Sequence, residues 1–577
     1  MTLKELRISK GLGQKECADL LGMSTRNYQN YENDESRVST AKYNAVYHKL
    51  EAYSVQSASL NEKRQTETKF YTNVIIGEKL KGFYNTVKKY KKRDCFGLLK
   101  KFIEDDYYYG KICILYGLRR TGKSTLLFQM IGELPVEETA YIKARVTDNM
   151  ANLTKDLKML LDSGVRYVFI DEITLMEDFI NTAAVLSDIY SMLGMKIVVS
   201  GTDSLGFAMA NRDELYDRNV MIHTSFISFR EYVRLLGISS VDSCIEYGGT
   251  LKMGNVSFDN FESRIDDASF RDDESTRKYI DTAISRNIQH TLKNDSYGEY
   301  FNHLRVLYDK GELTTVINRI VEDMNHNFLL RVIEDELKSH DSGSAKDLLL
   351  HDVPDQKAYV LGDGNIKSIL ERLKEIIEVK EKSETQVAVT QERVEKVRKY
   401  LIMLDLIVNI PDHYEGANPT DHYIFTQPGM RYSIAKTLVY SLMQDEYFKT
   451  VSAENRKYII ENILSDVKGR MLEDMVLLEV KETLPKGKDV CKFKFATGGE
   501  FDMVIYDERG EGAEIFEIRH SDKIVDKQMR FLLDKKKCDF IEFRYGKLKG
   551  KNVLYRGETK RIGEIQYKNI EEFLTEL

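Results

Sequence analysis

The segment from Gly117 to Thr125 constrains the fold of this chain more than any other segment. It reads GLRRTGKST, and residues 117–124 fit the pattern G-x-x-x-x-G-K-[ST]. The apolar run 112–116 precedes it and a helical pattern over 125–130 follows. Strand, glycine loop and helix are the context in which this pattern binds phosphate, whereas a plain glycine turn before a helix is the alternative.

The residue types in this loop predict their roles. Gly117 and Gly122 let backbone N–H groups curl around phosphate oxygens, and the helix N-terminus adds a partial positive charge. Lys123 would reach the β- and γ-phosphates, and the Ser124 hydroxyl would ligate Mg²⁺. ATP and Mg²⁺ are therefore the expected cofactors. The residues expected to line the nucleotide are Gly117, Arg119, Arg120, Thr121, Gly122, Lys123, Ser124 and Thr125.

Two further apolar runs end in polar residues. Residues 167–170 form a continuous apolar run that ends in Asp171 and Glu172. Because the carboxyl ends of parallel strands are where open α/β sheets bind ligands, we expect Asp171 to support the Mg²⁺ ion. Glu172 is expected to orient the attacking water. Alone, such a run followed by two acids is also common at protein surfaces.

The third run, over 195–199, ends in Ser200, Gly201, Thr202 and Asp203. Its polar end would lie beside the other two strand ends, within reach of the γ-phosphate. The alternative role for Ser200 and Thr202 is an ordinary helix N-cap.

Composition limits the remaining possibilities. A chain of 577 residues is too long for one core, so three or four domains are expected. The net charge of −7 gives no overall basic character, so any nucleic-acid binding must come from local patches. Six scattered cysteines without a C-x-x-C pair suit a reducing compartment. Without a signal peptide or a long apolar stretch, we expect a soluble, cytoplasmic protein with no membrane contact.

Residues 1–53 read as a separate all-α unit. Helical patterns cover Thr2–Lys10, Gln14–Leu21 and Ser24–Asn33, with glycine-containing turns between them. This stretch resembles the Cro/repressor-type helix-turn-helix family, in which the third helix enters the major groove of DNA. The resemblance implies DNA as a partner, and it makes the following residues the candidate base or phosphate contacts: Thr25, Arg26, Gln29 and Asn30. A helical module that docks onto another protein is the alternative.

Residues 54–94 are expected to form a linker because the first part has few apolar residues. Within it, the basic cluster 88–93 contains one tyrosine. This cluster could contact nucleic acid, although a solvated helix face is the simpler interpretation.

Residues 95–240 are expected to form a P-loop α/β domain whose parallel sheet is covered on both faces. With 117–125, 170–172, 200–202 and 227–231 in this order, the chain resembles prokaryotic AAA+-like ATPases. That family has a P-loop domain, a central helical and winged-helix region, and a C-terminal domain similar to restriction endonucleases. The strand end 200–202 departs from the family's T-G-S-S sequence, which weakens a sensor role for Thr202.

The same resemblance implies an arginine finger. Arg218 falls where the family usually has an arginine before a strand, and Arg212 is the second choice. Such a finger commonly comes from a neighbouring subunit, so a homo-oligomer is the implied assembly. A surface ion pair is the alternative role for either arginine.

The resemblance also organises the rest of the chain. It implies a helical lid or insertion over 241–350, a winged-helix-like domain over 351–450 and an α/β endonuclease-like domain over 451–577. The central region could contact DNA or pack between domains. In the last domain, the acids implied to hold Mg²⁺ are Glu473, Asp502 and Glu517. Arg519 occupies the place of the family's lysine, so either an active nuclease or a degenerate scaffold fits.

The sequence therefore predicts a Mg²⁺-dependent ATPase that couples ATP binding and hydrolysis to a DNA-associated conformational change. Two alternatives remain: a DNA-binding regulator that nucleotide switches with negligible turnover, and an ATP-regulated nuclease effector in defence against mobile DNA. No guanine-specific N-K-x-D-like sequence stands out, which favours ATP over GTP.

Overall fold

The computed structural model describes residues 2–10, 12–33, 40–51, 69–251, 269–285, 391–441, 452–525 and 529–577, with scattered positions over 304–332 and residue 449. Residues 54–68 of the predicted linker lie outside these residues. So does most of 286–390, which spans parts of the predicted lid over 241–350 and of the predicted winged-helix-like domain over 351–450. The chain divides into two compact units, Met1–Phe70 and Tyr71–Leu577, and each is described by itself.

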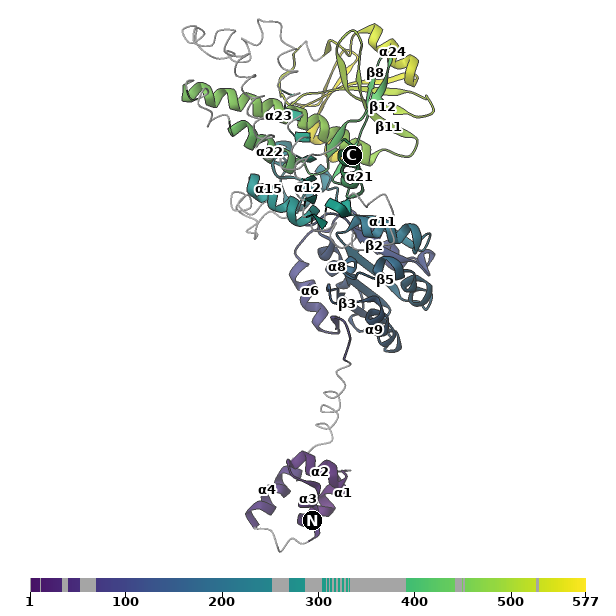
Figure 1. Cartoon of the computed structure of the whole chain (residues 1–577), viewed down its shortest axis with the longest axis vertical. Helices are drawn as coiled ribbons and strands as arrows, with labels where there is room; N and C mark the ends of the chain where they lie inside the picture. Colours follow the sequence, from purple (N-terminus) through teal and green to yellow (C-terminus); the bar gives the residue numbers. More distant parts are fainter. Residues whose placement is uncertain are drawn as a thin grey trace. The chain divides into compact units, whose positions relative to one another are not determined.

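The described residues of the N-terminal unit form a small bundle of four helices (Figure 1). These are α1 (Leu3–Ser9), α2 (Gln14–Leu21), α3 (Thr25–Asn33) and α4 (Thr40–Glu51). The three helices predicted from the sequence are present, and α4 is an additional one. Thr2 caps α1 through a capping box with Glu5, and the Ser24 hydroxyl accepts from the backbone N–H of Asn27 at the start of α3.

The second unit begins earlier than the sequence predicted. Strand β1 (Val74–Ile76) and helix α6 (Lys79–Val87) occupy the second half of the expected linker 54–94. β1 pairs antiparallel with β3 (Thr139–Lys143), and α6 packs against α8 (Lys123–Ile131). The linker prediction is thus wrong from residue 71 onward, because charged residues on the exposed face of α6 concealed its buried apolar positions, Leu80 and Val87.

The nucleotide-binding region is built on a six-stranded sheet in the order β1-β3-β4-β5-β2-β6. Every pairing in it except β1–β3 is parallel, as predicted. Its remaining strands are β2 (Ile112–Tyr116), β4 (Tyr167–Asp171), β5 (Lys196–Gly201) and β6 (Asn219–His223). β5 lies between β2 and β4, so the three predicted polar strand ends share one edge of the sheet.

Helices connect these strands, as expected for an α/β domain (Figure 1). They are α7 (Phe96–Glu104), α8, α9 (Met150–Asp162), α10 (Phe179–Thr182), the π-helical segment η5 (Leu186–Ser191) and α11 (Ser204–Asp213). One buried cluster joins α7 and α8 to the sheet through Leu99, Phe102, Leu126 and Phe169. This packing fixes the start of α8 against the end of β2.

A central region follows with helices α12 (Phe229–Leu236), α13 (Val241–Tyr247), α15 (Asp273–Ile280), α21 (Gln391–Met403) and α22 (Pro428–Ser441). After α21, a long hairpin runs through β7 (Ile407–Asn409), β8 (Asp412–Tyr414), β9 (Ala417–Thr420) and β10 (Tyr423–Phe425). β7 and β10 pair with each other, whereas β8 pairs parallel with the C-terminal strand β11 (Lys488–Lys494). The predicted wing therefore packs onto the C-terminal sheet, which favours the packing role over DNA contact.

The C-terminal region opens with the 31-residue helix α23 (Ala453–Thr483). Its eight-stranded sheet has the order β15-β16-β14-β13-β12-β11-β8-β9. The elements not yet given are β12 (Glu500–Asp507), β13 (Ala513–Ile518), α24 (Lys535–Tyr545), β14 (Leu548–Tyr555), β15 (Lys560–Ile562), β16 (Ile565–Asn569) and α25 (Ile570–Glu576). This sheet contains both parallel and antiparallel pairings and has its own buried core.

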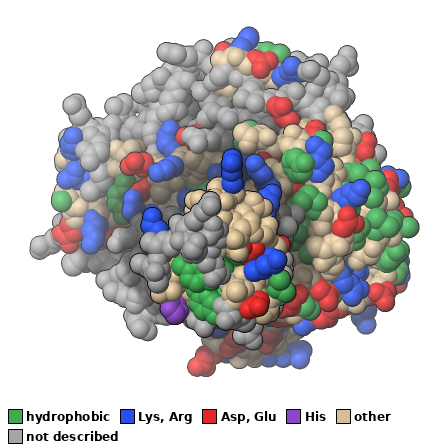
Figure 2. All heavy atoms as spheres, turned by 90° about the horizontal axis from the view of Figure 1, so that it is seen from below, with side chains coloured by type: hydrophobic (Ala, Val, Ile, Leu, Met, Phe, Trp, Pro, Cys, Tyr) green, Lys and Arg blue, Asp and Glu red, His purple; other side chains and the backbone are tan. Residues whose placement is uncertain are grey.

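Among the described residues, no helix combines the length and apolar composition that a membrane-spanning segment needs. On the face shown in Figure 2, lysine and arginine side chains are interspersed with aspartate and glutamate. That face carries no continuous field of one sign, in keeping with the small net charge.

Candidate functional site

The phosphate loop has the conformation that its glycines require. Gly117 has φ 142° and Gly122 has φ 91°, a region that L side chains rarely adopt. A Cβ on Gly117 would lie 2.6 Å from Thr224 Oγ1, so no side chain fits there. Gly122 precedes the first residue of α8, and the backbone N–H groups of that turn are available to an anion.

Lys123 is buried at the start of α8. Its ammonium donates to the carbonyls of Gly117 and Leu118, both at 2.8 Å. Burial lowers the Lys123 pKa to about 8, although Glu172 and Asp171 partly oppose this shift. The ammonium is thus held over the loop by neutral carbonyls, where phosphate oxygens could replace them.

Asp171 lies at the carboxyl end of β4 and is 1% exposed. Its Oδ2 accepts hydrogen bonds from Ser124 Oγ at 3.0 Å, Tyr141 OH at 3.0 Å and Lys143 Nζ at 2.7 Å. Ser200 Oγ, from β5, donates to its Oδ1. Burial raises the pKa of Asp171, but Lys143 and the hydrogen bonds outweigh burial and hold it below the ordinary value. Asp171 is therefore a carboxylate in direct contact with the loop's serine.

Glu172 follows in a left-handed conformation with φ 59°, which is uncommon for a residue with a side chain. Thr202 Oγ1 is 3.5 Å from its Oε2. The sequence alternative, that Ser200 and Thr202 cap a helix, is wrong, because Asp203 caps α11 through the backbone N–H of Gly206. Unfavourable backbone at a strand end beside a phosphate loop is typical of functional sites.

The other predicted loop residues have different surroundings. The Arg120 guanidinium donates to Ser269 Oγ at 2.9 Å, and the Arg119 carbonyl accepts from Tyr279 OH at 3.1 Å. Thr121 is buried, and its hydroxyl donates to the Leu118 carbonyl. Thr125 is partly exposed in the first turn of α8. The Arg119 carbonyl and the Arg120 side chain thus tie the loop to neighbouring segments, and the Thr121 side chain stabilises the loop itself.

Sequence reasoning missed the buried arginine that braces the loop. Arg93, the last residue of the basic cluster 88–93, is 7% exposed and forms a two-fold ion pair with Glu231 at 2.6 and 3.0 Å. It also donates to the carbonyls of Thr121 and Thr224. Neither suggested role for the cluster, DNA contact or a solvated face, describes this residue. Glu231 belongs to the segment 227–231, so that segment supports the loop through Arg93.

Arg218 lies away from the loop of its own chain. It immediately precedes β6, whose Asn219 is level with Ile112 at the start of β2, whereas Gly117 follows the end of β2. The Arg218 guanidinium is 45% exposed and pairs with Asp188 at 2.9 Å. It is therefore at the opposite edge of the sheet. Arg212 lies on α11, and its side chain is outside the described part.

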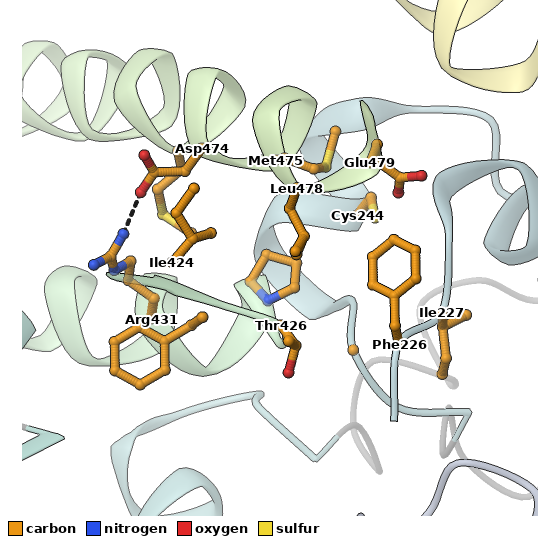
Figure 3. Close-up of a pocket in the computed structure, with 14 residues that line it drawn as sticks. Phe226, Ile227, Cys244, Ile424, Thr426, Arg431, Asp474, Met475, Leu478 and Glu479 are labelled. Atoms are coloured by element: carbon orange, nitrogen blue, oxygen red, sulfur yellow. Dashed lines mark hydrogen bonds and ion pairs between the residues drawn. The ribbon is translucent and has the colours of Figure 1, made fainter. Parts of the chain in front are cut away.

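Helix α23 contacts the segment that braces the loop (Figure 3). Glu479 Oε1 accepts from the backbone N–H of Phe229 at 2.6 Å, and its Oε2 is buried without a hydrogen-bond partner among the described residues. Burial raises the Glu479 pKa to about 8, despite that hydrogen bond. In the close-up, Met475, Leu478 and Glu479 line the same small pocket as Phe226 and Ile227. This junction joins the nucleotide-binding and C-terminal regions.

The C-terminal acids converge, with one unexpected member. Glu473, Glu500 and Asp502 each offer an oxygen within 4.8 Å of the others. Glu517 carries the predicted third carboxylate, but its Oε2 is bound to Arg519 at 2.5 Å. Sequence reasoning missed Glu500, although it lies two residues before Asp502 and therefore on the same face of β12.

Three cations neutralise these acids. Lys492 Nζ lies 2.8 Å from Glu473 Oε2 and 3.2 Å from Glu500 Oε1, and Arg470 also contacts both acids. Arg519 contacts Asp502 at 3.1 Å. Burial and the Glu473 charge raise the Asp502 pKa to about 6. Burial also opposes ionisation of Glu500, but Lys492 and Arg470 lower its pKa to about 2. Burial raises the pKa of Glu517.

The predicted DNA contacts lie on α3. Arg26 and Asn30 are exposed, Thr25 is partly exposed, and Gln29 donates to Gln14 Oε1 at 3.1 Å. The side chain of Glu32 is buried and accepts from Arg7, Gln14 and Tyr28, which fixes α3 against α1 and α2. The sequence did not predict the three hydrogen bonds to Glu32, because they join residues from three different helices.

Residues 109–233 match the AAA domain family. This match supports an AAA-like P-loop fold for the nucleotide-binding region, and it covers less than half of the chain.

A curated relative, the uncharacterized protein MJ1544 of Methanocaldococcus jannaschii, is 26% identical over 198 residues. That alignment covers 32% of this chain and 44% of the relative, so the chain spans less than half of the relative's length.

Two solved structures resemble the chain weakly. C. elegans PCH-2 has a TM-score of 0.18 and 13% identity over 33% of this chain and 53% of the other. The Aeropyrum pernix ORC1 protein, solved in complex with DNA, has a TM-score of 0.20 and 11% identity over 64% and 95% of the two chains. Scores this low carry no argument.

Proposed function

We propose that this chain is a Mg²⁺-dependent ATPase that couples ATP binding and hydrolysis to a DNA-associated conformational change. The observation that carries the ATPase proposal is the 3.0 Å hydrogen bond between Ser124 and Asp171, which join the phosphate loop to the end of β4. A hydroxyl and a carboxylate at this separation suit the oxygen ligation that Mg²⁺ prefers. The residues present therefore fit the metal that the AAA family implies.

Each side chain has a distinct part in the proposed reaction. Ser124 and Asp171 would hold Mg²⁺, which would supply neutralisation of phosphate charge at this site. Lys123 leaves the Gly117 and Leu118 carbonyls for phosphate oxygens, and the backbone N–H groups at the start of α8 hold the triphosphate. Glu172, fixed by its strained backbone, orients the water that attacks the γ-phosphate.

A pair of substitutions tests this assignment. Lys123→Ala should lower steady-state phosphate release at least about a hundredfold by removing charge stabilisation of the transferred group. Glu172→Gln should retain ATP binding and lose turnover, because only water activation is removed. Lys158→Ala, at an exposed position of α9, is the matched control. Unchanged phosphate release in Lys123→Ala would overturn the ATPase assignment.

The DNA-associated part of the proposal rests on the N-terminal unit. Its four-helix arrangement and the exposed side chains of Arg26 and Asn30 support a DNA-reading role for α3. Single-turnover hydrolysis with and without duplex DNA distinguishes a DNA-stimulated ATPase from a nucleotide-gated switch with negligible turnover. Arg26→Ala should weaken DNA binding and leave turnover without DNA unchanged. Unchanged DNA binding in this variant would favour a protein-docking module.

We also propose that Arg218 completes the site of a neighbouring copy. Its place at the opposite edge of the sheet and its exposure support action on another subunit. Inactive Lys123→Ala and Arg218→Ala chains should recover activity on mixing, because a mixed pair combines one intact loop with one intact finger. Full activity of Arg218→Ala alone would contradict this role and leave the Asp188 ion pair as its function.

A Mg²⁺-dependent nuclease is a second candidate, favoured by the convergence of carboxylates in the C-terminal region. Mg²⁺-dependent cleavage that disappears in Asp502→Ala and Glu517→Ala would support it. Absence of cleavage across single-stranded, duplex and RNA substrates would argue for a scaffold.

A further inference from the structure

The cation that neutralises Asp171 in this structure is Lys143, the last residue of β3. The β3–β4 register places Lys143 level with Asp171, and its Nζ donates to Asp171 Oδ2 at 2.7 Å. Among the described residues, no other cation forms an ion pair with Asp171. A single lysine therefore balances the carboxylate that is proposed to hold Mg²⁺.

The oxygen that Lys143 contacts is the one that faces the phosphate loop. Asp171 Oδ2 also accepts hydrogen bonds from Ser124 Oγ and from Tyr141 OH, both at 3.0 Å. A carboxylate oxygen offers about two lone-pair sites, so the third donor is one more than Oδ2 holds well. One of the three donors is therefore easy to displace.

Lys143 is the donor best able to leave. Tyr141 is 3% exposed, and its ring packs against Phe83 and Phe128 with ring centroids 5.2 and 5.3 Å away. Ser124 is fixed in the first turn of α8. The Lys143 side chain, by contrast, is 41% exposed and has a long, flexible stem. Two of the donors are thus built into the fold, whereas the ammonium can move into solvent.

A metal ion held by Ser124 and Asp171 would meet this ammonium. Like charges about 4 Å apart repel strongly in a partly buried site, and two cations on one carboxylate oxygen are about this close. Lys143 must therefore leave Oδ2 before a metal ion can bind there.

We infer that Lys143 is a positioning residue that occupies the metal side of Asp171 in the nucleotide-free chain and gives way when Mg²⁺ binds. The inference rests on the Mg²⁺-dependent nucleotide site proposed above. It explains how a carboxylate that is 1% exposed is tolerated before a metal arrives, because Lys143 supplies the missing charge. It also means that metal enters against a competing cation until the phosphates of a nucleotide add their negative charge. Lys143 thus makes Mg²⁺ binding and nucleotide binding depend on each other.

Mn²⁺ binding to the full chain without nucleotide tests this role. Electron paramagnetic resonance counts the bound Mn²⁺, and the part that is lost in Ser124→Ala belongs to the nucleotide site. Any Mn²⁺ held by the carboxylate cluster, which consists of Glu473, Glu500 and Asp502, remains in that variant and is subtracted. Lys143→Met should raise the Mn²⁺ affinity of the nucleotide site about tenfold, because a competing charge is removed.

Two control variants separate the charge of Lys143 from its packing. Lys143→Arg keeps a positive charge at the end of β3 and should bind Mn²⁺ within about threefold of the parent chain. Lys158→Met removes an exposed lysine from α9 and should leave the affinity unchanged. Thermal melting of each variant shows whether the fold is kept. A purely structural role for Lys143 would lower the Mn²⁺ affinity in Lys143→Met rather than raise it.

Unchanged or weaker Mn²⁺ binding in folded Lys143→Met would overturn the inference. So would a nucleotide site that stays empty in both chains, because the lysine would then not be what excludes the metal. Phosphate release by the parent chain is measured separately. Turnover in the parent without a gain of Mn²⁺ affinity in Lys143→Met rejects this role and retains the ATPase. A gain of Mn²⁺ affinity without any turnover in the parent retains the role of Lys143 and rejects the ATPase.

Discussion

The nucleotide site and the carboxylate cluster both bury charged side chains, but the partners of the buried cations differ. At the nucleotide site, Lys123 rests on neutral carbonyls and keeps its charge for an incoming anion. In the carboxylate cluster, Lys492 and Arg519 rest on acids that have one oxygen to spare. The charges around each site therefore support our proposals of a phosphate group at the first and a metal ion at the second.

The largest effect is expected from a substitution at Arg93, the residue that braces the nucleotide loop. Arg93→Met should destabilise the second unit by about 3 kcal/mol, because it leaves Glu231 buried without its cation. Chemical denaturation measures this loss. Lys92→Met, which breaks an exposed pair with Glu133, should cost under about 1 kcal/mol. If the two sites are built separately, Mn²⁺ affinity at the cluster should not change in Arg93→Met.

The junction between the two regions carries a pH-dependent effect. Glu479 has a folded-state pKa of about 8, so its stabilising neutral form is fully present below the unfolded pKa. Stability should fall as pH rises from the ordinary glutamate pKa towards 8, where the unfolded state has already lost its proton, and it should level off above pH 8. Since one pKa unit is worth about 1.4 kcal/mol, Glu479→Gln should recover on the order of 2 kcal/mol at pH 8. Melting curves between pH 5 and 9 measure this.

The exposed Glu461→Gln, on the same helix, is the control for that series. It should show the pH dependence of the parent chain. A Glu479→Gln chain with that same dependence would exclude a neutral carboxyl at the junction.

At the cluster, Lys492→Met should increase Mn²⁺ affinity by about tenfold, because one competing positive charge leaves Glu473 and Glu500. Calorimetry at low salt measures the change. Weaker Mn²⁺ binding would mean that Lys492 orients the carboxylates rather than competing with the metal.

The smallest expected effect concerns pH at the nucleotide site. Lys123 has a pKa of about 8 without phosphate, and bound phosphate should raise it. Below pH 8 the lysine is charged in both states, whereas above it ATP binding must take up a proton. Affinity should therefore fall about twofold between pH 8 and 8.5. Calorimetry in buffers of different ionisation enthalpy should detect the proton, and its absence would contradict the lowered pKa.

The two sites also differ in how much the sequence reveals. Lys123 and Ser124 belong to one continuous motif, and Asp171 ends an apolar strand, so local patterns locate all three. The sheet order then brings them together as parallel-strand rules predict. Arg93 was misjudged because its neighbours in sequence are exposed lysines, and only the fold brings Glu231 to it.

The cluster draws on α23, β11, β12 and β13, and no spacing in the chain links them. Lys492 reaches the acids from a neighbouring strand at a register shift that the sequence does not signal. Arg519 binds Glu517, and it is Glu500 that converges with Glu473 and Asp502. Motif reasoning therefore located the region and two of the three acids that converge there, Glu473 and Asp502.

Anomalous diffraction from a crystal containing Mn²⁺ and a non-hydrolysable ATP analogue tests the central claim most directly. Two peaks are predicted. One should lie beside Ser124 with the triphosphate on the loop and Lys123 turned from the Gly117 carbonyl to phosphate oxygens. The other should lie among Glu473, Glu500 and Asp502. A triphosphate that leaves Lys123 on its carbonyls, with no metal beside Ser124, would contradict the account.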